Sequence, residues 1–254
     1  MYDRPSLRLI VASLPPSLKR LSLNKSRVGT AKQSGDGNNN PPPAKIIHVR
    51  RNMLQAPTLD AQGRPMTSTT LFMTADLPDA DPLAYWVLPR SLNHLSLQGA
   101  FLCDADMPAI AKSLPAGLTA LVLRDNVLCK EGYEALEPAL PPSPKILDIC
   151  NTGIDDDGAM TLAKYLPATL LEFDLGMGTL GDTGAGAKAL AAKLPSSLQV
   201  LFIDQNQFGD DGLRAFARAL PSGLKLVHAY SVGASESAIA EFRGAAGMAE
   251  EIKA

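Results

Sequence analysis

Short stretches of alternating apolar and polar residues return at a nearly constant interval along the chain. The dipeptide Leu-Pro marks each return, and successive prolines are 26, 26, 26, 28 and 26 residues apart. These prolines are Pro89, Pro115, Pro141, Pro167, Pro195 and Pro221. A fixed period of about 20 to 50 residues indicates a stack of similar structural units rather than a single-centred globule.

Each interval begins with the pattern of one short strand. Apolar residues stand six and eight positions after the proline, with a different residue between them, which is the period of a half-buried strand. The first set is Leu95, Leu121, Leu147, Phe173, Leu201 and Val227, and the second is Leu97, Leu123, Ile149, Leu175, Ile203 and Ala229. We therefore predict six regular strands over residues 88–230.

The second half of each interval has the period of a helix. Apolar residues recur three or four positions apart, as in Leu162 and Leu166, and the next Leu-Pro ends the helix because proline cannot continue the hydrogen-bond ladder. An aspartate precedes most of these helices. We interpret this set as capping groups for free backbone N–H groups, in preference to a metal or acid/base site. Its members are Asp104, Asp156, Asp182 and Asp210.

The unit resembles the leucine-rich repeat, LxxLxLxxN, which residues 118–126 match from Leu118 to Asn126. Residues 208–221 are similar to the helical half of the ribonuclease-inhibitor-like subtype. The resemblance implies an α/β solenoid of about nine repeats, with a curved parallel sheet on the concave side and helices on the convex side. It also implies that the amides of Asn126 and Asn206 satisfy backbone groups in the turns.

Three regions are expected. Residues 1–87 hold degenerate repeats, with weak strand patterns near Ile47 and Leu71 and a low-complexity loop at 30–44. Residues 88–230 hold the regular repeats. Residues 231–254 are expected to cap the stack, with an Ala-rich helix over 236–253.

Composition narrows the function. The formal net charge is −2, and although residues 1–52 hold ten Lys or Arg against two acids, no aromatic residues interleave them. Nucleic acid is therefore not an expected partner. No apolar run approaches the roughly 20 residues of a membrane helix. The three cysteines form no CxxC pair, which favours a cytoplasmic protein over a secreted disulfide scaffold.

Polar and aromatic residues that flank the buried strand positions are the candidate binding residues. They are expected to project into the concavity, where acids beside aromatic anchors favour a protein partner of basic character. The alternative is a merely solvated inner face. The candidates are Arg124, Asp148, Asp174, Phe202, Asp204, His228 and Tyr230.

No catalytic, cofactor or metal site is expected. Cys103 and Cys129 share one repeat position, so a disulfide or a shared metal is open, with two inert thiols preferred. Residues 176–181 match GxGxxG, but they follow a repeat strand and do not open a dinucleotide-binding unit.

We predict a non-catalytic interaction scaffold. Two alternatives rest on resemblance: a GTPase activator similar to the Ran GTPase-activating protein, without the acidic tail those proteins often carry, and a ubiquitin-ligase adaptor. The second is disfavoured because the residues before the repeats have no F-box-like helical pattern. The fold by itself names none of them.

Overall fold

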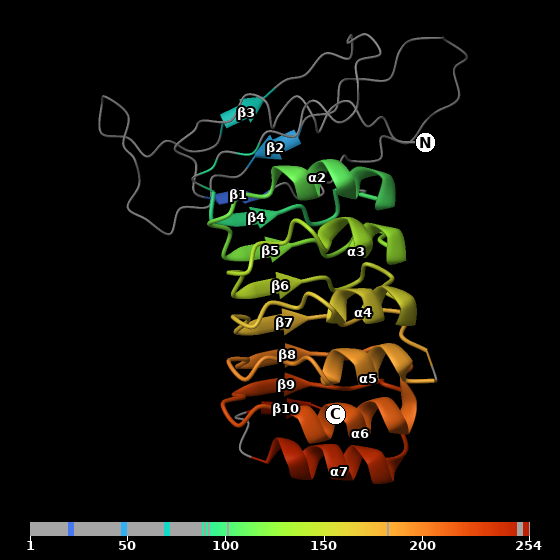
Figure 1. Cartoon of the computed structure of the whole chain (residues 1–254). Coiled ribbons are helices and arrows are strands. Elements are labelled where there is room, and N and C mark those ends of the chain that lie inside the picture. Colours follow the sequence, from blue (N-terminus) through green and yellow to red (C-terminus); the bar gives the residue numbers. More distant parts are fainter. Residues whose placement is uncertain are drawn as a thin grey trace, which may run out of the picture.

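A computed structural model describes residues 88, 90, 92–100, 102–181 and 183–247, with the backbone of four short strands at 20–22, 47–49, 69–71 and 251–253. Each regular coil holds one strand followed by one helix (Figure 1). The strands are β4 (His94–Ser96), β5 (Ala120–Val122), β6 (Ile146–Asp148), β7 (Glu172–Asp174), β8 (Val200–Phe202) and β9 (Leu226–His228). The helices are α2 (Met107–Ser113, after the 3-10 turn η2, Asp104–Asp106), α3 (Lys130–Leu136), α4 (Asp156–Ala163), α5 (Ala185–Ala191), α6 (Gly209–Ala219) and α7 (Glu236–Ala246).

The six strands form one parallel sheet in register. Leu95 pairs with Leu121, Leu121 with Leu147, and the pairing continues in the same way to Val227. Two further strands extend the sheet: β1 (Arg20–Ser22) pairs with β4, and β10 (Glu251–Lys253) pairs with β9. The predicted leucine-rich-repeat solenoid, with its parallel sheet and alternating helices, is confirmed.

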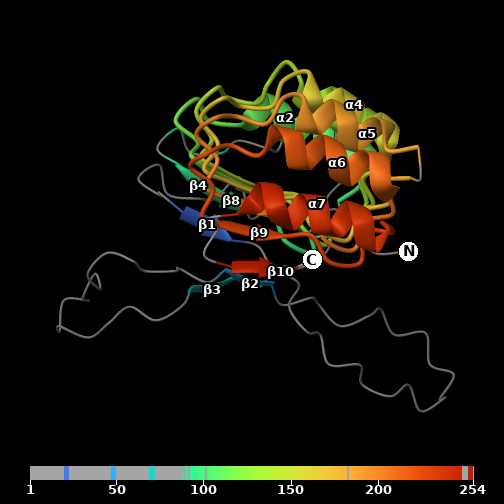
Figure 2. The same cartoon turned by 90° about the horizontal axis from the view of Figure 1, so that it is seen from below.

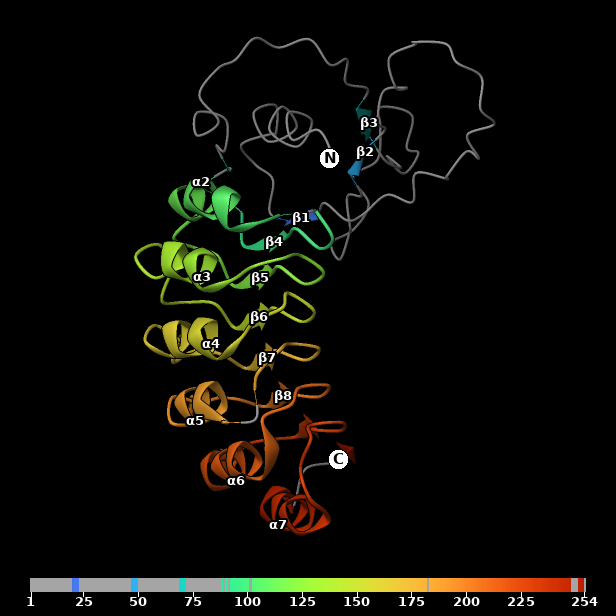
Figure 3. The same cartoon turned by 90° about the vertical axis from the view of Figure 1, so that its right-hand side faces the viewer.

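The helices lie together on one face of the sheet (Figures 2 and 3). Neighbouring strands lie about 4.8 Å apart, whereas packed helices need about 8–10 Å. The helices are therefore spaced more widely along the stack than the strands, as Figure 3 shows. The sheet consequently lines the inner side of the coil. None of the described helices is long and apolar enough to cross a bilayer.

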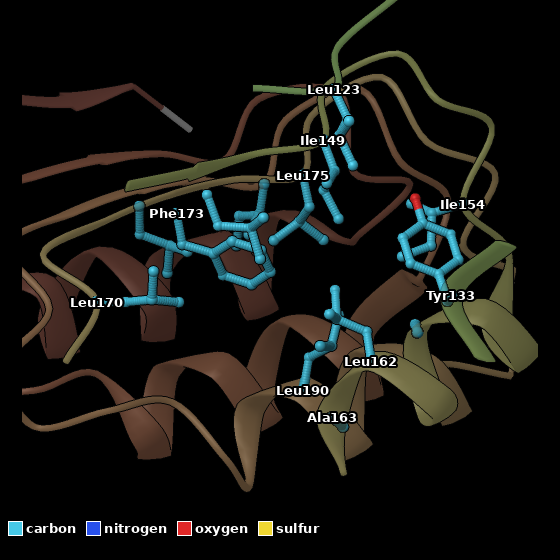
Figure 4. Close-up of a cluster of buried hydrophobic side chains, with 14 of the residues drawn as sticks. Leu123, Tyr133, Ile149, Ile154, Leu162, Ala163, Leu170, Phe173, Leu175 and Leu190 are labelled. Atoms are coloured by element: carbon cyan, nitrogen blue, oxygen red, sulfur yellow. The ribbon is translucent and has the colours of Figure 1, made fainter. Parts of the chain in front are cut away.

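The core is a layer between the sheet and the helices. Side chains from the two buried strand positions, such as Phe173 and Leu175, point toward helix residues such as Leu162 and Leu190 (Figure 4). All four are at most 1% exposed. Because every coil contributes the same few positions, no coil could bury its apolar side without its neighbours.

Glycines allow successive helices to pack closely. A Cβ atom built on Gly186 of α5 would lie 2.8 Å from the Cβ of Ala159 and from the backbone of Asp156, and one on Gly212 of α6 would lie 3.0 Å from the Cβ of Ala187. Real Cβ atoms essentially never lie within 3.0 Å of another heavy atom, so a side chain at Gly186 would force the two helices to shift, and one at Gly212 would need Ala187 to give way. Gly186 takes the place expected for Gly184, because the two extra residues of the long repeat lie between Leu180 and α5.

A left-handed residue follows each of the six regular strands, three positions after its last residue. This backbone conformation is strained for residues other than glycine. The row is Gly99, Asp125, Asn151, Met177, Gln205 and Ser231, with φ between 53° and 60°. It turns the backbone away from the sheet at the same point of every coil, and neither apolar spacing nor glycine content predicts it.

Two N-terminal strands pair differently from the strands of the regular coils. The strands β2 (Ile47–Val49) and β3 (Thr69–Leu71) form near the predicted positions, but they pair antiparallel with each other in a separate sheet. Parallel neighbours need a crossover connection, usually a helix, and the sequence between these two strands lacks a helical period.

The C-terminal helix is shorter than expected. It runs over Glu236–Ala246 and not to Lys253. Its end coincides with Gly247, whose φ of 28° departs from helical geometry, and residues 251–253 are the strand β10. Ser235 caps the start of α7 by accepting a hydrogen bond from the Ala238 N–H.

The predicted role of the asparagines is confirmed. The Asn126 amide nitrogen donates to the carbonyls of Leu97, Leu123 and Arg124, and its Oδ1 accepts from the Leu102 N–H. Asn206 donates to three equivalent carbonyls, those of Leu175, Ile203 and Asp204. In the coil of Asn151 the corresponding buried position belongs to Thr152, whose hydroxyl donates to the Ile149 carbonyl.

The predicted capping aspartates do accept backbone N–H groups, but from the next coil. Asp156 Oδ1 accepts from the N–H groups of Gly181 and Gly186, and its Oδ2 from the Thr183 hydroxyl. The cap of its own helix is Asp155, which accepts from the Gly158 N–H at 2.8 Å. Asp156 therefore joins two coils.

The same bridging geometry holds at two other coils. Asp104 accepts from the Cys129 N–H, and Asp210 accepts from the N–H and hydroxyl of Ser235. The bonds from Ser235 lower the pKa of Asp210. The fourth predicted cap, Asp182, lies outside the described residues.

Candidate functional site on the inner face

Alternation along the strands divides their side chains between the core and the inner face. The two rows predicted from the sequence lie on the side of the sheet away from the helices, because the residues between them are buried against the helices. Row one is Ser96, Val122, Asp148, Asp174, Phe202 and His228, and row two is Gln98, Arg124, Cys150, Gly176, Asp204 and Tyr230.

A third row was missed, although the same alternation predicts it one step closer to the start of each strand. It comprises His94, Ala120, Ile146, Glu172, Val200 and Leu226. Four of these residues are apolar and belong to the middle and end of the stack. The inner face therefore combines an apolar row with two rows that carry charges and aromatic rings.

Arg124 is the cation at the centre of the charged part. Its Nη1 lies 3.2 Å from Asp148 Oδ2 and 3.8 Å from Asp174 Oδ2, and its Nη2 lies 3.5 Å from the Cys150 sulfur. Its Nε lies 4.0 Å from Asp125 Oδ2. One guanidinium thus faces carboxylates from three successive coils.

Backbone amides hold the two central carboxylates in place. Asp148 Oδ1 accepts from the Cys150 N–H at 3.1 Å, and Asp174 Oδ1 accepts from the Gly176 N–H at 3.0 Å. The pairing of β6 with β7 places Asp148 directly beside Asp174. Two like charges are therefore fixed next to each other.

Asp204 adds a third carboxylate on the next coil. Only 9% of the residue is exposed. Its Oδ2 lies 3.3 Å from the point where a Cβ on Gly176 would be, the same distance as Asp174 Oδ1. The carboxylates of Asp174 and Asp204 therefore lie on either side of the buried Gly176.

Burial raises the pKa of three acids on this face, Asp148, Glu172 and Asp174. Burial, followed by the charges of Asp148 and Asp204, raises the pKa of Asp174 to about 6, against the opposing effects of the Gly176 N–H and Arg124. Burial also raises the pKa of Asp148 and of Glu172. The single positive charge of Arg124 therefore does not balance the negative charges of these acids.

Aromatic groups continue the inner face beyond the acids. The rings of Phe202 and His228 meet edge to face, with centroids 4.8 Å apart. The Tyr230 hydroxyl accepts from the Gln205 amide at 3.0 Å, and the residue is 39% exposed. An amphipathic ring held in this way presents contact area at a low cost in conformational entropy.

The cysteines do not form a reactive centre. Cys103, Cys129 and Cys150 form no disulfide with one another, and the described residues hold no group of three His, Cys, Asp or Glu side chains arranged for a metal ion. Burial and nearby acids raise the pKa of Cys150 to about 12. A thiol at that pKa is a poor nucleophile at neutral pH.

The structure thus brings all seven predicted site residues onto one face. Arg124, Asp148, Asp174 and Asp204 form a charged cluster, and the three aromatic residues form its neighbour along the stack. Glu172 joins the acids through its charge interaction with Asp148 and was missed by the sequence argument.

Comparison with known proteins agrees with this fold. The family model described as Leucine Rich repeat matches residues 195–217. Among solved structures the chain is similar to the leucine-rich repeat-containing protein LegL7 from Legionella pneumophila, with 16% identity and a TM-score of 0.44. That match covers 69% of this chain and 61% of the LegL7 chain. The search of curated proteins finds no match.

Together, the repeat spacing, the in-register parallel sheet and the family match to residues 195–217 show that this chain has the leucine-rich-repeat fold.

Proposed function

We propose that the chain is an interaction scaffold that binds a protein partner through its inner face. The observation that carries the proposal is the imbalance of that face: Asp148 and Asp174 share one arginine, and a third carboxylate, Asp204, lies beside them next to partly exposed aromatic rings. Repeat solenoids use such extended inner surfaces for binding. Aromatic anchors next to charges are typical of protein interfaces.

Charge defines the partner further. A partner with basic side chains would neutralise the excess negative charge of Asp148, Asp174 and Asp204. Complementary charge increases the association rate and selects against acidic proteins. Two alternative roles for these acids, capping a helix and binding a metal ion, do not fit their position on the strands.

Affinity capture with quantitative mass spectrometry tests the proposal. The full chain is compared with Asp174→Lys, with Phe202→Ala and with Glu131→Gln, which removes an exposed carboxylate at the start of α3 on the helix side. We expect one set of partners to be lost with the first two variants and kept with the third. Capture that is equal for all three, with thermal melting showing folded protein, contradicts the proposal.

A further inference from the structure

The inner side of β8 and β9 carries a patch of large, partly exposed side chains. Val200 and Phe202 of β8 pair directly with Leu226 and His228 of β9. We call these four residues the apolar patch. The described helices all lie on the opposite side of the sheet, so none of them covers it (Figures 2 and 3). Contiguous apolar side chains on a surface mark a site of interaction.

His228 belongs to the apolar patch although its ring has polar atoms. Its Nε2 is buried and has no hydrogen-bond partner among the described residues, so this part of the ring packs as an apolar group. The ring meets that of Phe202 edge to face, with centroids 4.8 Å apart. Two rings fixed against each other give a firm surface on which an apolar side chain can pack.

The apolar patch ends at a strand whose inner side is acidic. Glu172 of β7 pairs with Val200, and Asp174 of β7 pairs with Phe202. The boundary between β7 and β8 therefore has a carboxylate on one side and a large apolar group on the other at two successive positions. One ligand segment lying across this boundary would contact both.

The chain's own cation approaches these acids from the other direction. Arg124 follows β5, which lies two strands before β7 in the sheet. Its Nη1 is closer to Asp148, at 3.2 Å, than to Asp174, at 3.8 Å. The guanidinium therefore does not lie over the boundary with the apolar patch. A basic group of a partner placed there would complement the charge of β7.

Strand spacing fixes the separation of the two contacts. Neighbouring strands lie about 4.8 Å apart, so the middle of the apolar patch, between β8 and β9, lies about 7 Å from β7. In an extended chain, residues two positions apart point to the same side and are also about 7 Å apart. An extended segment that runs along the stack thus reaches both places with residues separated by one other residue.

We propose that the apolar patch and the acids of β7 bind an extended segment of a partner protein in which one residue separates a basic residue from a large apolar residue. The basic group lies over Glu172 and Asp174, and the apolar side chain packs on Phe202 and Leu226. This inference rests on the proposed binding function of the inner face and states which sequence pattern that face selects.

The test uses the full chain labelled with nitrogen-15 and blocked glycine–serine peptides with Arg-Ser-Phe at the centre. The amide resonances of Asp174 and Phe202 report binding. One comparison peptide replaces arginine by neutral citrulline, a second replaces phenylalanine by serine, and a third joins arginine directly to phenylalanine. We expect Arg-Ser-Phe to bind about tenfold more tightly than each of the three, because each lacks or misplaces one of the two contacts.

Variants of the chain assign the two contacts. Asp174→Asn is nearly isosteric and should reduce the preference for arginine over citrulline by about fivefold, without changing the affinity for the citrulline peptide. Phe202→Ala should weaken the binding of both peptides by about tenfold, with thermal melting as the check that it is folded. Glu131→Gln, which removes an exposed acid on the helix side, should change neither titration.

Three results overturn the proposal. The first is equal affinity for the peptide in which arginine and phenylalanine are adjacent. The second is a preference for arginine that Asp174→Asn does not change. The third is a shift of the Phe202 resonance on concentrating the chain without peptide, together with faster sedimentation, which would assign the apolar patch to a second copy of this chain.

The capture experiment separates this inference from the proposed function. Partners lost with Asp174→Lys and Phe202→Ala, together with equal affinity for all four peptides, refute the sequence pattern alone. Partners and peptides that are both indifferent to these substitutions refute binding through the inner face as a whole.

Discussion

Aspartates occur in two rows of this solenoid, and the two rows differ in how well their carboxylates are hydrogen-bonded. On the helix side, Asp156 accepts hydrogen bonds from two backbone N–H groups and one hydroxyl of the following coil. On the strand side, Asp174 has one backbone N–H and a shared arginine, and burial and the charges of Asp148 and Asp204 oppose its ionisation. The first row holds coils together. The second row places like charges side by side on the face that we propose binds a partner.

The largest effect is expected on the helix side. Asp156→Ala removes three hydrogen bonds and leaves the Gly181 and Gly186 N–H groups without an acceptor. We expect the free energy of unfolding to fall by about 2 kcal/mol in urea titrations. Asp156→Asn, which keeps one acceptor oxygen, should recover part of that loss. A change within experimental error for the alanine variant would show that Asp156 does not join the coils.

The opposite sign is expected for Asp174→Asn. The pKa of Asp174 is raised to about 6 in the folded state, from an ordinary value of 3.8. The folded state thus binds the proton more tightly, and the carboxylate costs stability as the pH rises through this window. At pH 7.5 we expect the variant to be more stable by about 1–2 kcal/mol, allowing for solvent screening.

That gain should shrink as the pH falls from 7 toward 4, because the folded wild type then protonates Asp174 and no longer carries its charge. Urea titrations at several pH values measure it. The other charges facing this group are Asp148, Asp204 and Arg124, so their variants should shift the midpoint of the pH dependence. A gain that does not depend on pH would mean that packing, and not ionisation, explains the effect.

Arg124→Gln is expected to have a smaller effect. It removes the cation that faces Asp148 and Asp174, so the stability at pH 7 should decrease by about 1 kcal/mol. A double-mutant cycle with Asp148→Asn should show a coupling of about 0.5–1 kcal/mol. Independent effects of the two substitutions would indicate that the 3.2 Å contact contributes nothing in solution.

The smallest effect is expected for an ion pair on the helix side. Lys188 and Asp211 are in contact at 2.9 Å, but Asp211 is exposed. The lysine lowers the pKa of Asp211, so any stabilisation is present at neutral pH and lost as the pH falls through that lowered value. Asp211→Asn should nevertheless leave the melting temperature unchanged within error, because exposed pairs contribute little. A clear decrease would contradict the expectation that exposed ion pairs contribute less to stability than the aspartates that are hydrogen-bonded to the next coil.

The sequence predicts the repeating part of the fold because each coil obeys the same spacing. Buried strand positions such as Leu121 and Phe173, the bonding role of Asn126, and the inner-face placement of Asp148 and Asp174 all follow from it. The direction of the Asp156 hydrogen bonds does not follow from the spacing. Sequence spacing shows that an acid lies near the start of a helix, but it does not show which of two stacked helices that acid caps.

Other features depend on contacts between coils or on sequence without a period. In the coil that contains Asn151, the buried position is occupied by Thr152. The repeat consensus alone would assign that position to Asn151, one residue too early. The antiparallel pairing of β2 with β3 arises where the helical half of the repeat has been lost.

The close packing at Gly186 and Gly212 has a consequence for the opposite side of the molecule. The separation of successive helices sets the radius of the coil, and that radius sets how the strand-side acids and rings are angled toward one another. A methyl group at Gly186 would wedge α5 away from α4 and bend the stack more sharply at β7 and β8. Residues on the helix side, which no partner contacts, would then change the geometry of the proposed binding face.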